Sequence, residues 1–312
     1  MSLAEPDRRK ILLTGSHRSG TTWVAKMIAA APGIGYIHEP FNPVIYRPWL
    51  CSRKFEGFTY VTRDNEAPFV RPLQKTFNFS FNGWGAIRSI RSRGDLKRRL
   101  NDFRESRDRR KRSLRPLVKD PIAVFSAEWL ADRFDMDVIV LIRHPAAFVS
   151  SIKRVGWRHD FANLLGQPLL MRDHLRPFEG EIREFAEKDA STFDQAILIW
   201  RLIHQVIQTY QERRPDWIFL RHEDISRDPL GHFERLFEDL HIPYSHHVRK
   251  TVEAHSAPSN PSQAPDNEIN FIRRDSKSNI FAWKNRLSPE EIDQIRSRTR
   301  DVYPAFYSET DW

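Results

Sequence analysis

A short stretch near the N-terminus carries the residue types best suited to bind an anion. It reads Gly15-Ser16-His17-Arg18-Ser19-Gly20-Thr21-Thr22-Trp23. An apolar run, Ile11–Leu13, precedes it and predicts a buried strand, and the alanine-rich segment 24–31 that follows predicts a helix. A strand, a glycine loop and a helix together direct backbone N–H groups and the positive end of a helix dipole toward a phosphate.

The spacing of Gly15 and Gly20 matches the nucleotide P-loop, G-x-x-x-x-G-K-[ST], with one change. Thr21 occupies the position of the lysine that normally reaches the outer phosphates of ATP or GTP, and Arg18 is the cation of this loop instead. The loop therefore suits anion binding better than cleavage of a triphosphate. A tight turn before a helix is the purely structural alternative, and the hydroxyl groups of Ser19, Thr21 and Thr22 favour the phosphate site.

A second group of anion-binding residue types follows the apolar run Val138–Ile142. Five consecutive apolar residues predict a strand buried on both faces, as in a parallel sheet. In nucleotide-hydrolysing P-loop proteins this strand ends in the aspartate that supports Mg²⁺. Here it ends in Arg143, whose guanidinium group can grip a phosphate with two hydrogen bonds. Ser151, eight residues later, can add a hydroxyl donor, and Ser150 is the alternative if the helix register differs.

A carboxylate and a lysine follow two further predicted strands. Glu39 ends the short predicted strand 36–39, just before Pro40, and is placed to project from a strand end. His38 is its neighbour, and adjacent strand residues point to opposite faces. Lys119 lies near the end of a third predicted strand, in Leu117–Pro121. Alternatively, Glu39 pairs with a nearby arginine without doing chemistry, and Lys119 is an exposed lysine at a strand terminus.

The loop Arg18–Trp23 resembles the 5′-phosphosulfate loop of the sulfotransferases that use 3′-phosphoadenylyl sulfate (PAPS). Arg143 and Ser151 resemble the 3′-phosphate site of the same family. The resemblance extends over residues 11–288, and these two motifs are its more specific parts. It implies a PAPS-dependent enzyme that transfers a sulfuryl group to a hydroxyl or amine, releases adenosine 3′,5′-bisphosphate (PAP) and needs no metal.

The resemblance also implies roles for individual residues. Glu39 matches the family's general base, while Arg18 and Lys119 would offset charge on the leaving oxygen. The donor-binding residues that it implies are Arg18, Ser19, Gly20, Thr21, Thr22, Trp23, Arg143, Ser151, Arg274 and Lys277.

The C-terminal part of this set departs from the family pattern. Where cytosolic members have Arg-Lys-Gly before Asp-Trp-Lys, this chain has Ser276, Lys277 and Ser278 before Trp283. Arg274 is the candidate that compensates for the missing arginine. Glu223 matches a scaffold residue of the family rather than a catalytic one.

Alternating strands and helices predict an α/β fold with a P-loop-type parallel sheet, helices on both faces and insertions. We expect one sulfotransferase domain over residues 1–312. Its core elements are expected at about 8–40, 116–156 and 192–300, and its insertions at about 41–115 and 157–191. The second insertion is predicted to form a lid or an acceptor-facing loop. In the first, the alternation of Phe77, Phe79 and Phe81 suggests a strand or an aromatic surface.

The chain has 312 residues and a formal net charge of +9. Segment 88–115 holds 13 Lys or Arg against four Asp or Glu, so the basic excess is concentrated there. Leu96, Leu100 and Phe103 recur at helical spacing and favour a solvated helix. Capture of an acidic substrate, peripheral contact with an anionic membrane and nucleic-acid binding are the alternatives, and thin aromatic interleaving makes nucleic acid the least favoured, so no nucleic-acid partner is expected.

Two other functions remain as alternatives: a P-loop small-molecule kinase, and a non-catalytic protein that binds anionic polymers through segment 88–115. A single cysteine, a polar N-terminus and the lack of a long apolar run predict a cytoplasmic location without a membrane anchor. The acceptor is expected to be a glycan, a glycolipid or a small molecule.

Overall fold

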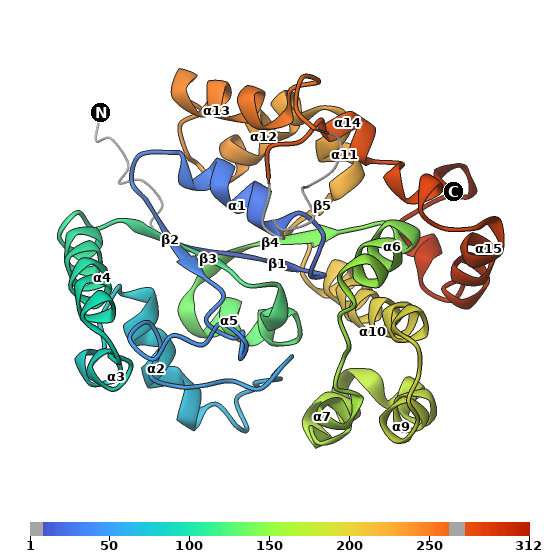
Figure 1. Ribbon diagram of the computed structural model, residues 1–312, viewed down its shortest axis with the longest axis horizontal. Helices are drawn as coiled ribbons and strands as arrows, with labels where there is room; N and C mark the ends of the chain where they lie inside the picture. Colours follow the sequence, from blue (N-terminus) through green and yellow to red (C-terminus); the bar gives the residue numbers. More distant parts are fainter. Residues whose placement is uncertain (1–8, 262–271) are drawn as a thin grey trace. The chain divides into compact units, whose positions relative to one another are not determined.

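The structure is a computed structural model that describes residues 9–261 and 272–312. Five strands are hydrogen-bonded in the order β2-β3-β1-β4-β5, and β3 pairs in parallel with both β1 and β2, as does β4 with β5. The predicted α/β fold with a parallel sheet flanked by helices is therefore confirmed (Figure 1). The strands are β1 (Lys10–Gly15), β2 (Ile34–His38), β3 (Arg115–Lys119), β4 (Met136–Ile142) and β5 (Ile218–Arg221).

Fifteen α-helices occur in the described residues. They are α1 (Thr21–Ala29), α2 (Ala67–Phe77), α3 (Gly83–Arg88), α4 (Arg93–Lys111), α5 (Ala127–Phe134), α6 (Pro145–Val155), α7 (Phe161–Leu165), α8 (Pro168–Leu170), α9 (Glu179–Glu187), α10 (Thr192–Arg213), α11 (His222–Arg227), α12 (Pro229–Asp239), α13 (His246–Ser256), α14 (Ser276–Asn279) and α15 (Pro289–Arg298).

The chain divides into two compact units, and β1 runs from one into the other. The first unit comprises Met1–Thr14 and Pro32–Val138, and the second comprises Gly15–Ala31 and Ile139–Trp312. The single-domain organisation expected from the sequence stays a prediction.

The first unit has an aromatic core beside β2 and β3. Phe41 stacks on Phe55, which stacks in turn on Phe69 of α2. The ring of Phe77, at the end of α2, meets that of Phe134 from α5 edge to face at 5.0 Å. These contacts hold the irregular chain after β2 and the helix after β3 together, which fixes the ends of both strands.

The second unit is helix-rich. The long helix α10 packs against α6, which follows β4, and α15 also packs on α6. In a second group of helices, α1 packs against α13, α13 against α12 and α12 against α11. One face of α10 is apolar and buried, and Trp200 in it is fully buried. Its indole N–H donates to the Arg143 carbonyl at 2.9 Å, which steadies the chain just after β4.

One local prediction concerns the segment after α2. The alternation of Phe77, Phe79 and Phe81 is not a strand, since Phe77 ends α2 and Phe79 has a φ of 52°. Elsewhere, the residues of β5 are half-buried. Ser126 precedes α5 but does not cap it, because its hydroxyl donates to the Thr59 carbonyl.

The insertion 157–191 is not an irregular loop. It forms α7, α8 and α9 with short helical turns between them, and α7 packs against α9 (Figure 1). Phe161, Leu164 and Ile182 are buried in this group. The sequence interpretation gave too much weight to its charges and prolines and too little to these spaced apolar residues.

None of the helices in the described parts of the chain has the length and apolar character needed to cross a membrane.

Candidate active site

The loop between β1 and α1 depends on two glycines with positive φ. At Gly15, φ is 122°, and a Cβ atom would collide with the Leu141 backbone of β4. At Gly20, φ is 89°, and a Cβ atom would lie 2.6 Å from Nδ1 of His222. Gly20 also precedes α1 without a side-chain cap. Because glycine has no side chain, only backbone atoms at Gly20 lie next to the first-turn N–H groups of α1.

The structure brings the two predicted anion-binding motifs together within the second unit. Arg143, which follows β4, donates a hydrogen bond from Nη1 to the carbonyl oxygen of Arg18 in the loop. The Nε of Arg18 donates to the hydroxyl of Ser151 in α6 at 3.1 Å. The loop arginine thus contacts both members of the other motif, so the two form one continuous site.

Further arginines surround this pair and make the site strongly cationic. Burial, with smaller contributions from the charges of Arg143 and Arg154, lowers the pKa of Arg18 to about 10. Burial also lowers the pKa of Arg274 to about 10, with contributions from Arg143, Arg18, Arg154 and Arg286. For Arg143, burial again lowers the pKa, although the carboxylate of Glu223 opposes this effect. Cations that repel one another in this way favour an anion between them.

Several polar atoms of this site are buried without a hydrogen-bond partner in the described structure. They are Nε of Arg143, Nε of Arg274 and the hydroxyls of Ser16 and Ser150. Buried donors of this kind cost free energy unless a ligand or water satisfies them. The site therefore has the donors, the charge and the loop geometry that an anionic ligand requires.

Glu223 lies under this site as a scaffold residue. It is 6% exposed and accepts hydrogen bonds from the His144 N–H at 3.1 Å and the Tyr307 hydroxyl at 2.8 Å. Burial raises its pKa. Its bond to the N–H after Arg143 holds the backbone at the end of β4.

The segment 156–160 covers the loop on one side. The ring of Trp157 stacks on that of His17 and lies 5.4 Å from the Arg18 guanidinium. The Nε2 atoms of His159 and His17 are 3.0 Å apart. Burial lowers the pKa of His159 to about 4, so this ring is neutral at physiological pH.

The remaining predicted donor-binding residues differ in how deeply they are buried. Ser19 and Thr21 are buried in the loop, and Thr22 is half-buried. Trp23 is buried, with its ring edge-to-face to those of His222 and Phe233. Lys277, by contrast, is exposed in α14 and does not contribute to the charge of the arginine cluster.

Sequence reasoning missed three residues of this site. Arg154 lies three residues after Ser151 on α6, so helical spacing could have revealed it. His222 follows β5 directly, a strand-end position that was not considered. Burial lowers its pKa to about 3, and Arg143 and Arg274 add to this effect. Arg286 follows a short 3₁₀ turn, and no sequence signal pointed to it.

In the first unit, Glu39 and Lys119 form a buried ion pair. Lys119 is 2% exposed, so it is not the exposed strand-end lysine of the alternative interpretation. The other carboxylate oxygen of Glu39 accepts from Nδ2 of Asn42 at 2.6 Å. Glu39 has a φ of 46°, just after β2, and its N–H donates to the Lys119 carbonyl at 2.9 Å.

The ion pair sets the charge state of Glu39. Burial alone would raise its pKa, but the Lys119 ammonium, the hydrogen bond that it donates and the bond from Asn42 bring the pKa below the ordinary value. Next to the pair, burial raises the pKa of Asp120 to about 8, and the charge of Glu39 adds to the rise. Asp120 accepts from the N–H groups of Phe41 at 2.6 Å and Ile122 at 3.0 Å, which holds the chain after Glu39 in place.

His38, the neighbour of Glu39, has a different environment. Its Nδ1 lies 2.7 Å from the hydroxyl of Tyr36 on the same strand. Burial and the charge of Glu39 raise the pKa of that hydroxyl. Of these two candidates for the general base, Glu39 is the ionised one, and its carboxylate is paired with Lys119.

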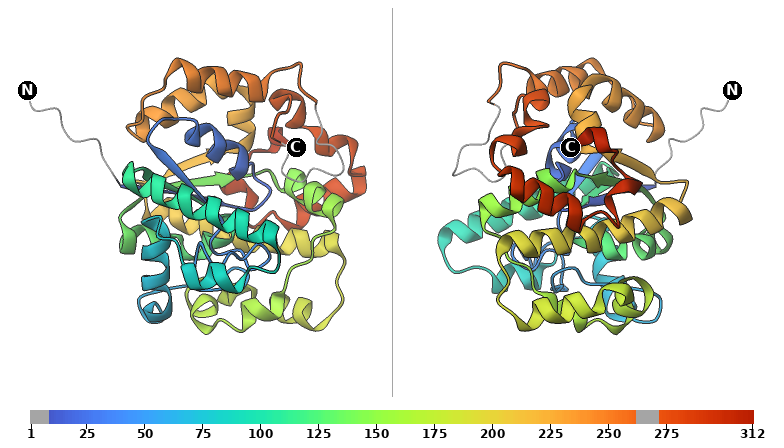
Figure 2. Two further views of the ribbon diagram at one scale, coloured as in Figure 1. Left: turned by 60° about the vertical axis from the view of Figure 1, so that its left-hand side comes forward. Right: turned by 90° about the vertical axis from the view of Figure 1, so that its right-hand side faces the viewer.

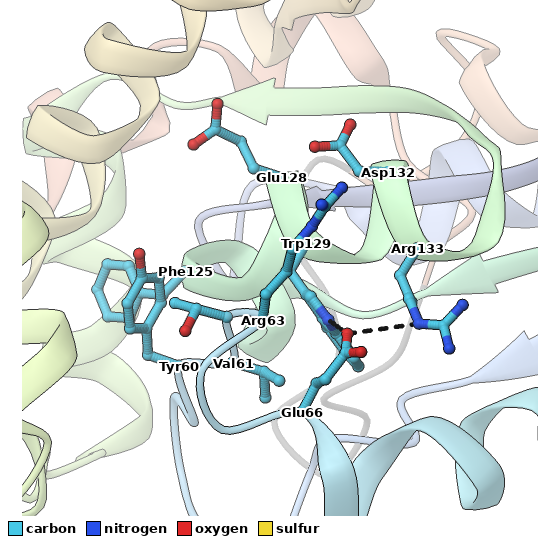
Figure 3. A pocket seen from close by; sticks show the side chains of 10 residues that line it. Tyr60, Val61, Arg63, Glu66, Phe125, Glu128, Trp129, Asp132 and Arg133 are labelled. Carbon is cyan, nitrogen blue, oxygen red and sulfur yellow. Dashed lines mark hydrogen bonds and ion pairs between the residues drawn. The ribbon is translucent and has the colours of Figure 1, made fainter.

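A separate pocket of about 450 Å³ lies in the first unit, between the segment 60–66 and α5 (Figure 3). The carboxylate of Glu66 accepts from the indole of Trp129 at 2.7 Å and pairs with Arg133 at 3.4 Å. None of the predicted site residues lines this pocket, so it is not the candidate active site.

Across the described residues, no group of three or more His, Cys, Asp and Glu side chains is arranged to hold a metal ion.

The fold and the site define an α/β protein of the P-loop type whose loop lacks the lysine of nucleotide-hydrolysing enzymes. The chain matches the sulfotransferase domain family over residues 8–306. It belongs to that family and is a sulfotransferase. No curated protein sequence gives a significant match to it.

Solved structures of similar proteins include three sulfotransferase-fold examples. The sulfotransferase domain from the curacin biosynthetic pathway has 16% identity and a TM-score of 0.49, with 94% of this chain and 97% of that chain covered. Mouse sulfotransferase SULT7A1 complexed with PAP has 11% identity and a TM-score of 0.48, with 98% and 88% covered. Retinol dehydratase with androsterone and inactive cofactor PAP has 14% identity and a TM-score of 0.43, with 95% and 81% covered.

Proposed function

We propose that this sulfotransferase transfers a sulfuryl group from PAPS to a hydroxyl or amine of an acceptor and releases PAP. The observation that carries the proposal is the contact of Arg143 and Ser151 with the P-loop arginine, Arg18. A nucleotide with phosphates at both its 5′ and 3′ positions matches two adjacent anion-binding motifs, whereas ATP has no group for the second.

The residues present fit such a donor. The loop N–H groups after Gly20, with the hydroxyls of Thr21 and Thr22, would hold the 5′-phosphate. Arg143 and Ser151 would hold the 3′-phosphate, and Arg274 would supply the charge that the family's C-terminal arginine provides elsewhere. The unpartnered Nε atoms of Arg143 and Arg274 are donors available for this purpose.

The donor supplies an activated sulfuryl group, and the chain supplies position and charge. Charge builds up on oxygens during such a transfer, with nucleophile and leaving group in line, so fixed cations contribute most. Arg18 and Lys119 are the proposed cations for the leaving oxygen. Glu39 is the proposed general base that accepts the acceptor's proton, because it is ionised and lies at a strand end.

The kinase alternative requires groups that this chain lacks in the corresponding positions. Thr21 replaces the P-loop lysine, and Arg143 replaces the aspartate after the fourth strand. Replacement of a carboxylate by a guanidinium removes a cation ligand and creates an anion ligand. These two exchanges favour the PAPS donor.

The test is transfer of labelled sulfuryl from PAPS to a panel of hydroxyl and amine acceptors, with Mg·ATP as the competing donor. We expect sulfated product and PAP, with no phosphorylated product. PAP binding by thermal shift, measured separately, distinguishes an unsuitable acceptor panel from a wrong donor. Stabilisation by Mg·ATP but not by PAP would contradict the proposal.

A further inference from the structure

The helix α4 carries three apolar side chains that are partly exposed to solvent. Leu96, Leu100 and Phe103 are 47%, 49% and 44% exposed, and no residue of α4 is buried. Their spacing places all three on one side of the helix. In Figure 2 (left), α4 lies on the outside of its unit. The ring of Phe103 meets that of Phe81 edge to face at 5.5 Å, and charged residues occupy most of the other positions of α4.

Residues on the adjoining side of α4 attach it to the protein through polar contacts. Arg109 donates to the Tyr36 carbonyl at 2.8 Å, and the Ser106 hydroxyl donates to the Phe79 carbonyl at 3.1 Å. The guanidinium of Arg99 lies 3.2 Å from the centre of the Trp49 ring. Because these contacts fix the orientation of the helix, the exposed stripe follows from the fold and not from a detached helix.

Basic and further apolar side chains adjoin the stripe. Arg104 and Arg107 follow Leu100 and Phe103 by four residues each, so they lie on the same side of α4 and are exposed. The short helix α3 precedes α4 by four residues and exposes Trp84 by 75% and Ile87 by 63%. Segment 88–115 has a charge of +9, from 13 basic and four acidic residues.

We propose that α3 and α4 form a docking surface for an anionic lipid membrane. The charge complements anionic headgroups, while the leucines and aromatic rings can enter the boundary between headgroups and acyl chains. Arginine stems can lie along the same apolar boundary with their charges in the headgroup layer. A soluble polyanion would use the arginines but would leave the apolar stripe in water, so the membrane accounts for both features.

The test is cosedimentation of the full chain with vesicles of phosphatidylcholine alone and of phosphatidylcholine mixed with phosphatidylglycerol. We expect binding to the anionic vesicles that weakens with salt, and little binding to the neutral ones. The triple variant Leu96→Ser, Leu100→Ser, Phe103→Ser should reduce the partition coefficient by about tenfold or more. Arg104→Glu with Arg107→Glu should reduce it as well.

Val44→Ser is the matched control, since Val44 is 89% exposed in the same unit but outside this surface. It should bind vesicles as the wild type does, and thermal melts should show all variants folded. Absence of vesicle binding, equal binding to neutral vesicles or undiminished binding by the triple serine variant would each overturn the proposal. So would heparin binding that depends on the two arginines without any vesicle binding, which would identify a soluble polyanion as the partner.

Discussion

The arginine cluster of the second unit and the Glu39–Lys119 pair of the first unit solve the problem of buried charge in opposite ways. In the first unit, each charge has a partner of opposite sign, and Asn42 completes the hydrogen bonding of Glu39. In the second unit, burial and neighbouring arginines lower the pKa values of Arg18, Arg143 and Arg274, with Glu223 as a partial counter-charge to Arg143.

This difference indicates what each region needs from outside. A buried ion pair balances its own charge, and its ionised carboxylate is the group that we propose as the general base. A cluster of buried cations with unsatisfied donors is incomplete, and an anionic ligand would relieve both the repulsion and the lost hydrogen bonds. We therefore expect acid–base chemistry in the first region and anion binding in the second, and the variants below test this expectation.

Loss of the Glu39 carboxylate should have the largest effect. We expect Glu39→Gln to reduce kcat by about 10²–10⁴-fold, since it removes the proposed general base. PAP affinity should stay within about twofold, because the cluster of the second unit is untouched. Glu66→Gln is the control, an ion-paired carboxylate of the same unit outside the proposed site. Full activity in Glu39→Gln would remove Glu39 from the mechanism.

Loss of the Arg143 guanidinium should act on donor binding. Arg143→Met should weaken PAP binding roughly a hundredfold, as expected when one partner of a buried charged hydrogen bond is removed. Binding of adenosine 5′-phosphate should change much less. Titration calorimetry on the variant and on Arg183→Met, a surface arginine of α9, measures the contrast. An equal loss for both nucleotides would show that Arg143 does not recognise the 3′-phosphate.

Removal of Lys119 should destabilise the protein and alter its pH dependence. Lys119→Met leaves Glu39 buried without its counter-ion, which should cost about 3 kcal/mol of unfolding free energy at neutral pH. In the wild type, the lowered pKa of Glu39 contributes stability above the ordinary glutamate value of about 4.3, and this stability is lost as pH falls through the lowered pKa.

The pH–rate profile of the same variant gives a second readout. With Lys119 removed, burial should raise the pKa of Glu39, so the acid limb of kcat/KM should move to higher pH. An unchanged acid limb would mean that another group accepts the proton. Chemical denaturation at several pH values measures the stability component.

Removal of one cation from the arginine cluster of the second unit should stabilise the ligand-free protein, whereas removal of Lys119 destabilises it. This effect should be the smallest of those predicted here. We expect Arg274→Met to stabilise the ligand-free protein by about 1 kcal/mol, because it relieves repulsion among buried arginines. The same change should weaken PAP binding. Thermal melts with and without PAP measure both effects, and destabilisation of the free protein would contradict the contrast between the two regions.

The sequence predicted the parts of the fold that depend on short-range patterns. The run Val138–Ile142 identified β4, and the spacing of Gly15 and Gly20 identified the loop between β1 and α1. The stripe of α4 shows the limit, because helical spacing predicted the helix but not that Leu96, Leu100 and Phe103 would face solvent. That orientation depends on contacts such as Arg109 with Tyr36, which are distant in sequence.

The candidate site also contains residues that the sequence identifies and residues that it does not. Loop residues and strand-end residues, such as Arg18, Glu39 and Arg143, carry local signals and could be named in advance. Arg286 and His222 reach the cluster only through the packing of segments far along the chain, and the pairing of Glu39 with Lys119 spans 80 residues. Lys277 had a sequence match but is exposed, since a motif offset does not specify the direction of a side chain.

The most direct test compares the affinities of the wild-type protein for PAP and for adenosine 5′-phosphate by titration calorimetry. The account predicts that PAP binds on the order of a hundredfold tighter, because Arg143 and Ser151 add charged and neutral hydrogen bonds to the 3′-phosphate. Equal affinities would contradict it, since the arginine cluster would then have no role in recognising a doubly phosphorylated nucleotide.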